Sequence, residues 1–172
     1  MKKIALILLG IIGISVTALA GTKDKMDILG TYDDWSAYVY YKGNEKVCYI
    51  TAEPVKSAGK YKQRGDIFLY VTHHPTDSKF DVVDAVAGYT YKKQSKPTLT
   101  IDKNKPVVLF PVEDTAWTKD AAADAQLVAQ MKKGTTAVLK GTSARGTWTT
   151  DTFSLKGFSK AYRDIQKACG RE

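Results

Sequence analysis

The residues best suited to chemistry lie in a short segment near the C-terminal end of the chain. Ser143 and Arg145 stand within residues 141–147, and Asp151 follows shortly after. Arg145 next to a glycine is typical of a turn tip, where a guanidinium can bind a carboxylate or phosphate through two parallel hydrogen bonds. The alternative role is internal, with Arg145 holding Asp151 or a loop carbonyl. We take Arg145 and Ser143 as candidate ligand-binding residues.

His73 and His74 are the only histidines of the chain. Adjacent side chains on a strand point to opposite faces, so the pair makes a poor metal site without further ligands. We expect a structural or surface role, and we keep His73 as a third candidate ligand-binding residue.

The other candidate chemistries lack their usual surroundings. Ser143 has no nucleophile-elbow context and no histidine that the sequence pairs with it. Asp120 and Asp124 lack the glycine and the terminal glutamate of a calcium loop, so they are better explained as helix-capping acids. The sequence therefore predicts no catalytic residue, no metal and no cofactor.

The N-terminal residues have the pattern of an export signal. Lys2 and Lys3 precede an almost wholly apolar run over residues 4–16, and residues 18–20 form a small-x-small cleavage site. We expect residues 1–20 to be a signal peptide removed after Ala20; the alternative is an uncleaved anchor. No cysteine stands at the cleavage point, which disfavours a lipoprotein. The sequence thus predicts a single domain over residues 21–172 and a periplasmic or outer-membrane-associated location.

The chain has two cysteines, Cys48 and Cys169. Exported proteins fold in an oxidising compartment, where such a pair forms a disulfide. Redox-active cysteines usually stand close together as Cys-x-x-Cys. The wide separation of these two therefore favours a structural bridge between an early strand and the end of the final helix.

The charge of the chain is basic but dispersed. Its formal net charge is +8, which falls to +6 without Lys2 and Lys3. One explanation is a solvated lysine surface that maintains solubility. The other is attraction to an anionic surface such as lipopolysaccharide, phospholipid or host glycan. No basic run is interleaved with aromatic residues, and the chain is predicted to be exported, so we do not expect nucleic-acid binding.

Most of the chain has the hydrophobic alternation of β-strands. Residues 35–41 and 46–52 alternate on either side of a Gly43-Asn44 turn and predict a hairpin, whereas residues 56–65 are polar and predict a loop. The other expected strands lie within residues 66–72, 80–91, 98–102, 107–110, 135–142 and 147–155.

Two segments instead have helical spacing. Asp120 is placed to cap a helix over residues 121–133, and a second helix begins near Ser159 with Cys169 on its apolar face. That face should dock on the sheet. We therefore expect a mainly β fold, an antiparallel β-sandwich or barrel with two packed α-helices.

Several motifs together resemble the invasion-associated locus B family. Its C-terminal half is resembled by residues 141–147, 151–159 and 168–169, of which the first run is the most specific. The matches to its N-terminal half are residues 34–35, 47–50, 64–66 and 114–117. The resemblance covers residues 29–170. Where the family pattern has Thr-His-Arg-Pro, this chain has Thr72-His73-His74-Pro75, so the arginine of the family pattern is replaced by His74.

This resemblance implies an exported α-proteobacterial protein of the envelope or cell surface, in a family named for red-cell invasion. It implies no catalytic residues. We expect a non-enzymatic envelope protein that binds an envelope or host-surface partner or an anionic ligand, with peripheral contact to an anionic membrane surface and a contribution to host-cell invasion and virulence. The alternative is a periplasmic enzyme acting on cell-envelope material. A cleft that joins His73, Arg145 and acidic side chains would favour the enzyme; an exposed apolar or basic patch would favour binding.

Overall fold

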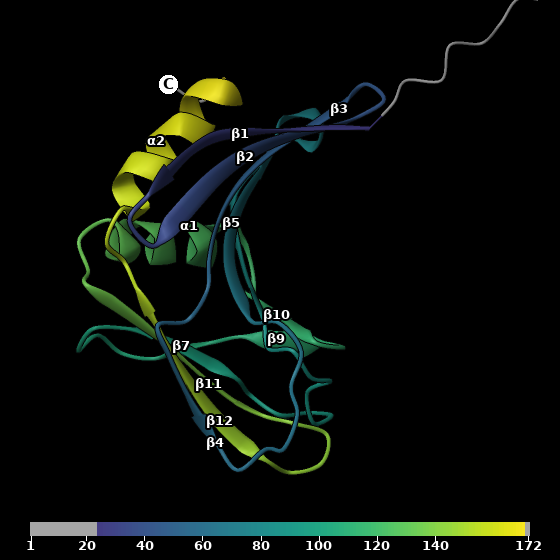
Figure 1. Cartoon of the computed structure of the whole chain (residues 1–172), viewed down its shortest axis with the longest axis vertical. Coiled ribbons are helices and arrows are strands. Elements are labelled where there is room, and N and C mark those ends of the chain that lie inside the picture. Colours follow the sequence, from purple (N-terminus) through teal and green to yellow (C-terminus); the bar gives the residue numbers. More distant parts are fainter. Residues whose placement is uncertain (1–23, 171–172) are drawn as a thin grey trace, which may run out of the picture.

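The computed structural model describes residues 24–170, so the predicted signal peptide lies outside the described residues. Within this range the strands form a seven-stranded and a five-stranded sheet, all paired antiparallel, with two α-helices (Figure 1). This confirms the predicted mainly β fold with two packed helices. Because the strands form two separate sheets, the sandwich-like alternative is the one observed.

The large sheet has the strand order β1-β2-β3-β5-β6-β10-β9. Its strands are β1 (Lys25–Tyr32), β2 (Trp35–Lys42), β3 (Glu45–Ala52), β5 (Phe68–His74), β6 (Lys79–Val86), β9 (Phe110–Val112) and β10 (Thr115–Trp117). A single 3-10 turn, Pro75–Asp77, joins β5 to β6. The predicted hairpin is confirmed as β2 and β3, in which Tyr38 stands opposite Tyr49.

The small sheet has the strand order β4-β12-β11-β7-β8. Its strands are β4 (Lys56–Gly59), β7 (Thr98–Ile101), β8 (Val107–Val108), β11 (Thr136–Thr142) and β12 (Trp148–Ser154). The predicted loop over residues 56–65 is corrected by β4. All four residues of β4 are exposed, so no hydrophobic pattern marks it, and it forms by backbone pairing with β12.

Helix α2 (Phe158–Ala168) covers one face of the large sheet. Alternation along β2 turns Trp35 toward it, and the Trp35 and Phe158 rings meet edge to face with centroids 4.9 Å apart. The predicted disulfide joins Cys48 on β3 to Cys169 just after α2, with Cα atoms 6.1 Å apart. The end of the last helix is therefore bonded to the sheet, as expected.

Helix α1 (Ala121–Met131) packs along β6. The Asp120 side chain accepts a hydrogen bond from Ala123 N at 2.8 Å, which confirms the predicted N-cap. Asp124 is buried and accepts from Val83 N at 2.9 Å, so the first turn of the helix is fixed to the strand. Neither α1 nor α2, the helices of the described range, is long and apolar enough to cross a membrane.

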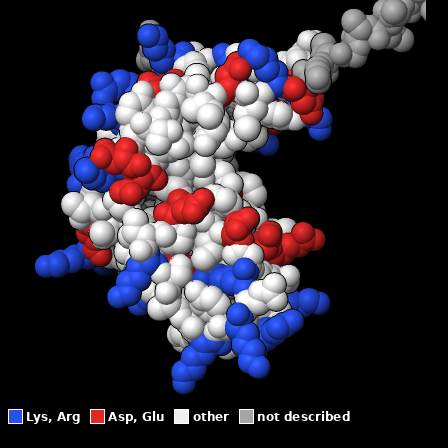
Figure 2. All heavy atoms as spheres, in the orientation of Figure 1, with Lys and Arg blue, Asp and Glu red and all other residues white. Residues whose placement is uncertain are grey.

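The large sheet is curved. Figure 1 shows both helices on the convex side of this sheet. The small sheet lies at the end of the molecule that is farthest from β1 and β2. The space-filling view in Figure 2 shows a hollow on the side away from the helices. Side chains alternate between the two faces of the large sheet. The face that lines the hollow is the one opposite to the face on which α2 packs.

Candidate functional site

The structure does not bring the three sequence-predicted site residues together. His73 is fully buried on the α2 side of β5, where its Nδ1 accepts from Asp81 N at 3.0 Å. Ser143 and Arg145 lie instead in the turn between β11 and β12 of the small sheet. The Ser143 hydroxyl accepts from Thr147 N at 3.2 Å, and the Arg145 side chain is exposed.

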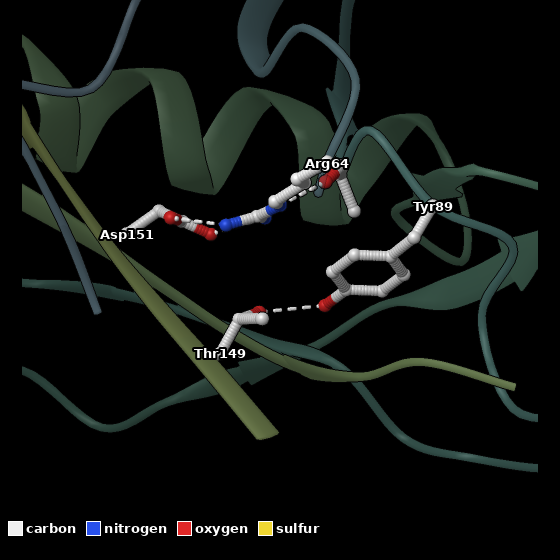
Figure 3. A network of polar contacts seen from close by, with 5 residues as sticks. Arg64, Tyr89, Thr149 and Asp151 are labelled. Atoms are coloured by element: carbon white, nitrogen blue, oxygen red, sulfur yellow. Dashed lines mark hydrogen bonds and ion pairs between the residues drawn. The ribbon is translucent and has the colours of Figure 1, made fainter. Parts of the chain in front are cut away.

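Asp151, the acceptor that the internal alternative gave to Arg145, is bound by Arg64. The two terminal guanidinium nitrogens of Arg64 donate to the two carboxylate oxygens of Asp151 at 2.7 and 2.6 Å (Figure 3). The side chains are 4% and 0% exposed. Because this bidentate pair is buried, removing either partner would leave an unpaired charge in the interior and would destabilise the fold.

The remaining contacts of Arg64 fix the loop that carries it. Its Nε donates to the Ala87 carbonyl at 2.6 Å, and its guanidinium carbon lies 4.9 Å from the centre of the Tyr89 ring. Tyr89 in turn shares a 2.6 Å hydrogen bond with Thr149 on β12, as Figure 3 shows. The network therefore ties the loop before β5 and the segment after β6 to the small sheet.

Sequence reasoning missed this network. Arg64 and Asp151 are far apart along the chain, and neither belongs to a recognised motif for an ion pair. The available signal was that residues 64–66 and 151–159 both carry the family resemblance.

A groove lies beside the network, with a volume of about 610 Å³. It is lined by Gly65, Asp66, Phe68, Val86, Gly88, Tyr89, Thr90, Glu113 and Asp114. Gly65 N donates to the Gly88 carbonyl at 2.9 Å, and Gly88 has a φ of 69°, so the two backbones approach as only glycines allow. Three carboxylates and no lysine or arginine line this acidic groove.

The acidic groove opens onto an aromatic surface on the large sheet. We define the tyrosine face as the side of that sheet away from α2, formed by Met26, Ile28, Tyr38, Tyr40, Tyr49, Phe68, Tyr70, Phe110 and Trp117. Tyr38 and Tyr49 stack with ring centroids 5.0 Å apart, and Tyr70 contacts Tyr49 at 6.0 Å. The rings thus form a continuous row across β2, β3 and β5.

The two ends of the tyrosine face are open to solvent. Ile28 is 67% exposed at one end, and Phe110 is 53% exposed at the other. Contiguous exposed apolar surface of this kind is uncommon on a folded protein unless it binds something. Tyrosine suits such a surface because it offers an apolar ring together with a hydroxyl that can form hydrogen bonds.

A carboxyl group lies within this face. Asp84 stands in register between Tyr70 on β5 and Trp117 on β10, so its side chain shares their face, and it is only 7% exposed. Burial, with a smaller contribution from the charge of Asp124, raises the pKa of Asp84 to about 7. Among the described residues, the influences on its carboxyl group are burial and the charge of Asp124, with no hydrogen bond. A cation brought to this face would find an acceptor there.

Charge is distributed unevenly over the molecule. Figure 2 shows acidic side chains across the middle of the molecule and beside the hollow, basic ones at the end formed by the small sheet, and a mixture of both charges at the opposite end. Among residues 24–170, no three His, Cys, Asp or Glu side chains lie close enough to hold a metal ion. What the described surface offers is an aromatic face with an acidic groove.

These features define a disulfide-bonded, sandwich-like β protein with one sheet face left open. Residues 35–166, about three quarters of the chain, match the family described as invasion associated locus B (IalB) protein. The chain belongs to that family, and membership indicates an invasion-associated envelope protein. Neither the curated proteins nor the solved structures include a significant match.

Proposed function

We propose that the protein is a non-enzymatic binding protein of the cell envelope, and that its tyrosine face receives an extended basic segment of a partner protein. Membership in an invasion-associated family supports a partner on the envelope or the host surface. The observation that carries the proposal is the position of Asp84 between Tyr70 and Trp117, on a face that continues into the acidic groove.

Charge complementarity supports a basic partner segment. Phe68 and Val86 stand opposite each other and line the groove, so the aromatic row leads directly to the carboxylates of Asp66 and Glu113. Apolar side chains of a bound segment would pack on the tyrosine rings. Its lysine or arginine side chains would reach the carboxylates and lie over ring faces, where cations are attracted.

The separation of the predicted site residues supports binding over catalysis. His73 is buried in the large sheet and Arg145 is exposed on the small one, so the cleft that would have favoured an enzyme does not join them. What the surface offers instead is the exposed apolar patch that favoured binding. Release of soluble fragments from cell-envelope material by the purified protein would argue against this part of the proposal.

Defined peptides test the proposed partner chemistry. The disulfide-bonded protein should bind a short peptide in which lysine alternates with valine, and should bind the matching glutamate–valine peptide far more weakly. Tyr70→Ala and Asp84→Asn should each weaken binding roughly fivefold or more. Trp148→Ala is the matched control, because it removes an exposed aromatic residue from the other sheet.

Two results would contradict the proposal. One is equal binding of the two peptides, which would leave no role for the carboxylates. The other is absence of peptide binding together with retention of neutral glycans, which would make the tyrosine face a carbohydrate platform. Calorimetry or fluorescence anisotropy measures either.

Export completes the proposal. Lys2, Lys3 and the apolar run over residues 4–16 support secretion with cleavage after Ala20. Protein purified from the native host should begin at Gly21 on N-terminal sequencing. Recovery of the intact chain beginning at Met1 in the membrane pellet would support an anchor instead.

A further inference from the structure

The small sheet has a solvent face of unusual composition. Its five strands contain one acidic residue, Asp151, which points to the buried side and is paired with Arg64. The solvent face carries Lys140 and Lys56 among threonines, and at its end Trp148, whose exposed fraction of 76% is the largest among the large hydrophobic residues described.

More cations gather around Trp148 at the end of the sheet that bears the β11–β12 turn. Lys92 N donates to the Thr142 carbonyl at 2.9 Å, which brings the Lys92-Lys93 pair to this turn. Gly59 pairs with Thr149, so Lys60 follows on the other side. We define the basic end as Lys60, Lys92, Lys93, Lys140, Arg145 and Trp148.

The charges of the basic end are available to a ligand. All five cations are exposed, and none forms an ion pair with another residue of the described chain. Tyr91 N donates to the Glu113 carbonyl at 2.7 Å, and the side chains of Glu113 and Asp114 line the acidic groove. Figure 2 shows the small-sheet end of the molecule in blue, without red side chains at its tip.

We propose that the basic end docks on the surface of an anionic phospholipid bilayer, with Trp148 at the level of the headgroups. Lysine and arginine side chains near such a surface are each attracted by about 1 kcal/mol, over a range limited by the Debye length. Tryptophan is the residue that favours the membrane–water interface, because its ring is apolar and its N–H is polar. A basic cluster around an exposed tryptophan matches this surface in both charge and polarity.

Docking through the basic end leaves the tyrosine face open. The hollow lined by that face opens to the side, while the small sheet forms one end of the molecule (Figures 1 and 2). The two binding surfaces use different sheets. The membrane proposal therefore does not depend on the peptide proposal, and either can fail alone.

Vesicle co-sedimentation tests the docking. The disulfide-bonded protein should bind vesicles of phosphatidylglycerol mixed with phosphatidylcholine and should not bind pure phosphatidylcholine vesicles. Binding should weaken as salt is raised. The double variant Lys140→Ala/Arg145→Ala should bind about thirtyfold more weakly, since each lost cation accounts for roughly a fivefold change.

A charge-matched control separates docking from general attraction. Lys103→Ala/Lys105→Ala removes two cations from the β7–β8 turn, which lies beyond Ile101 at the opposite end of the small sheet. This variant should lose at most about threefold in affinity, because its charges lie away from the docked surface. Equal losses in the two double variants would show that net charge alone drives the attraction and would overturn the proposal.

Tryptophan fluorescence tests the orientation. Anionic vesicles should shift the emission to shorter wavelength, the shift should persist in Trp117→Phe, and it should vanish in Trp148→Phe. Trp35 is fully buried and should not respond. Failure to bind the anionic vesicles at low salt would overturn the proposal. So would binding of a soluble polyanion such as heparin without any vesicle binding.

Discussion

Arg64 holds both carboxylate oxygens of Asp151 across the boundary between the two sheets. The guanidinium belongs to the loop that precedes β5 in the large sheet, and the carboxylate belongs to β12 in the small sheet. Both charges are withdrawn from water, so removing either one leaves the other buried and uncompensated. Gly65 and Asp66, which follow Arg64 in the chain, line the acidic groove. The pair therefore fixes this part of the groove relative to the small sheet.

Arg64→Ala should lower the free energy of unfolding by about 3–5 kcal/mol, because it strands the Asp151 carboxylate in the interior. Arg64→Lys keeps the charge but loses the two-pronged geometry, so its cost should be intermediate. Arg145→Ala is the control and should change stability by less than about 0.5 kcal/mol, since Arg145 is exposed. Urea unfolding curves measure all three. A large loss for Arg145→Ala with little for Arg64→Ala would contradict these assignments.

Removing the disulfide should destabilise the protein markedly. Cys48 and Cys169 are separated by 121 residues, and a closed loop of that length contributes about 4–5 kcal/mol in the chain-entropy account. Cys48→Ala/Cys169→Ala should lower the melting temperature and increase hydrogen exchange in α2. Thiol labelling of unreduced, denatured protein should find no free thiol; two labelled cysteines would refute the bridge.

Asp84 should make stability fall as pH rises. The pKa of its carboxyl group is about 7 in the folded protein and about 4 in an unfolded chain, so the folded state binds the proton more tightly. The stability that depends on a protonated Asp84 is fully present below about pH 4, is lost between about pH 4 and 7, and stays lost above that range. Asp84→Asn should flatten this profile and raise stability at pH 8 by at most on the order of 4 kcal/mol.

Chemical unfolding of the two proteins at pH 4, 6 and 8 measures this effect. Parallel pH profiles would contradict the assignment. The same titration should weaken binding of the lysine–valine peptide to the unmodified protein below about pH 7, because a protonated Asp84 no longer attracts a cation.

Gly157 and Gly146 form a matched pair with different expected costs. Both have positive φ, 91° and 82°, so alanine is strained at either position. A Cβ at Gly157 would collide with the backbone of Tyr32, whereas a Cβ at Gly146 would meet nothing. Gly146→Ala should cost about 1 kcal/mol and Gly157→Ala several times more. Thermal melts compare them, and equal costs would be inconsistent with the close packing of β1 against the start of α2.

Local sequence patterns determined much of the fold. Alternation over residues 35–41 and 46–52 predicted the β2–β3 hairpin because a half-buried strand must alternate. Asp120 marked the start of α1 because its side chain can accept from an unpaired N–H of the first turn. With only two cysteines, the partner of Cys48 was Cys169. Each of these inferences depends on interactions between near neighbours or on a unique choice.

Tertiary structure decided what alternation leaves open. An alternating strand has two faces, and only the docking of α2 determined that Trp35 is covered while Tyr38 is left to the hollow. Nothing local marks β4, because its exposed side chains carry no pattern and backbone pairing with β12 creates it. His73 is buried for the same reason that Trp35 is, since both lie on the face that the helix covers.

The candidate site also belongs to the tertiary structure. The sequence alone does not pair Arg64 with Asp151, because the chain offers many other acids and cations. Arg145, for example, stands much nearer to Asp151 along the chain than Arg64 does. Charges attract without regard to sequence separation, so the choice was made by the folded backbone, which brings the loop before β5 to β12 and excludes water from the pair. Asp84 likewise joined the proposed binding surface only when β5 and β10 placed Tyr70 and Trp117 on either side of it.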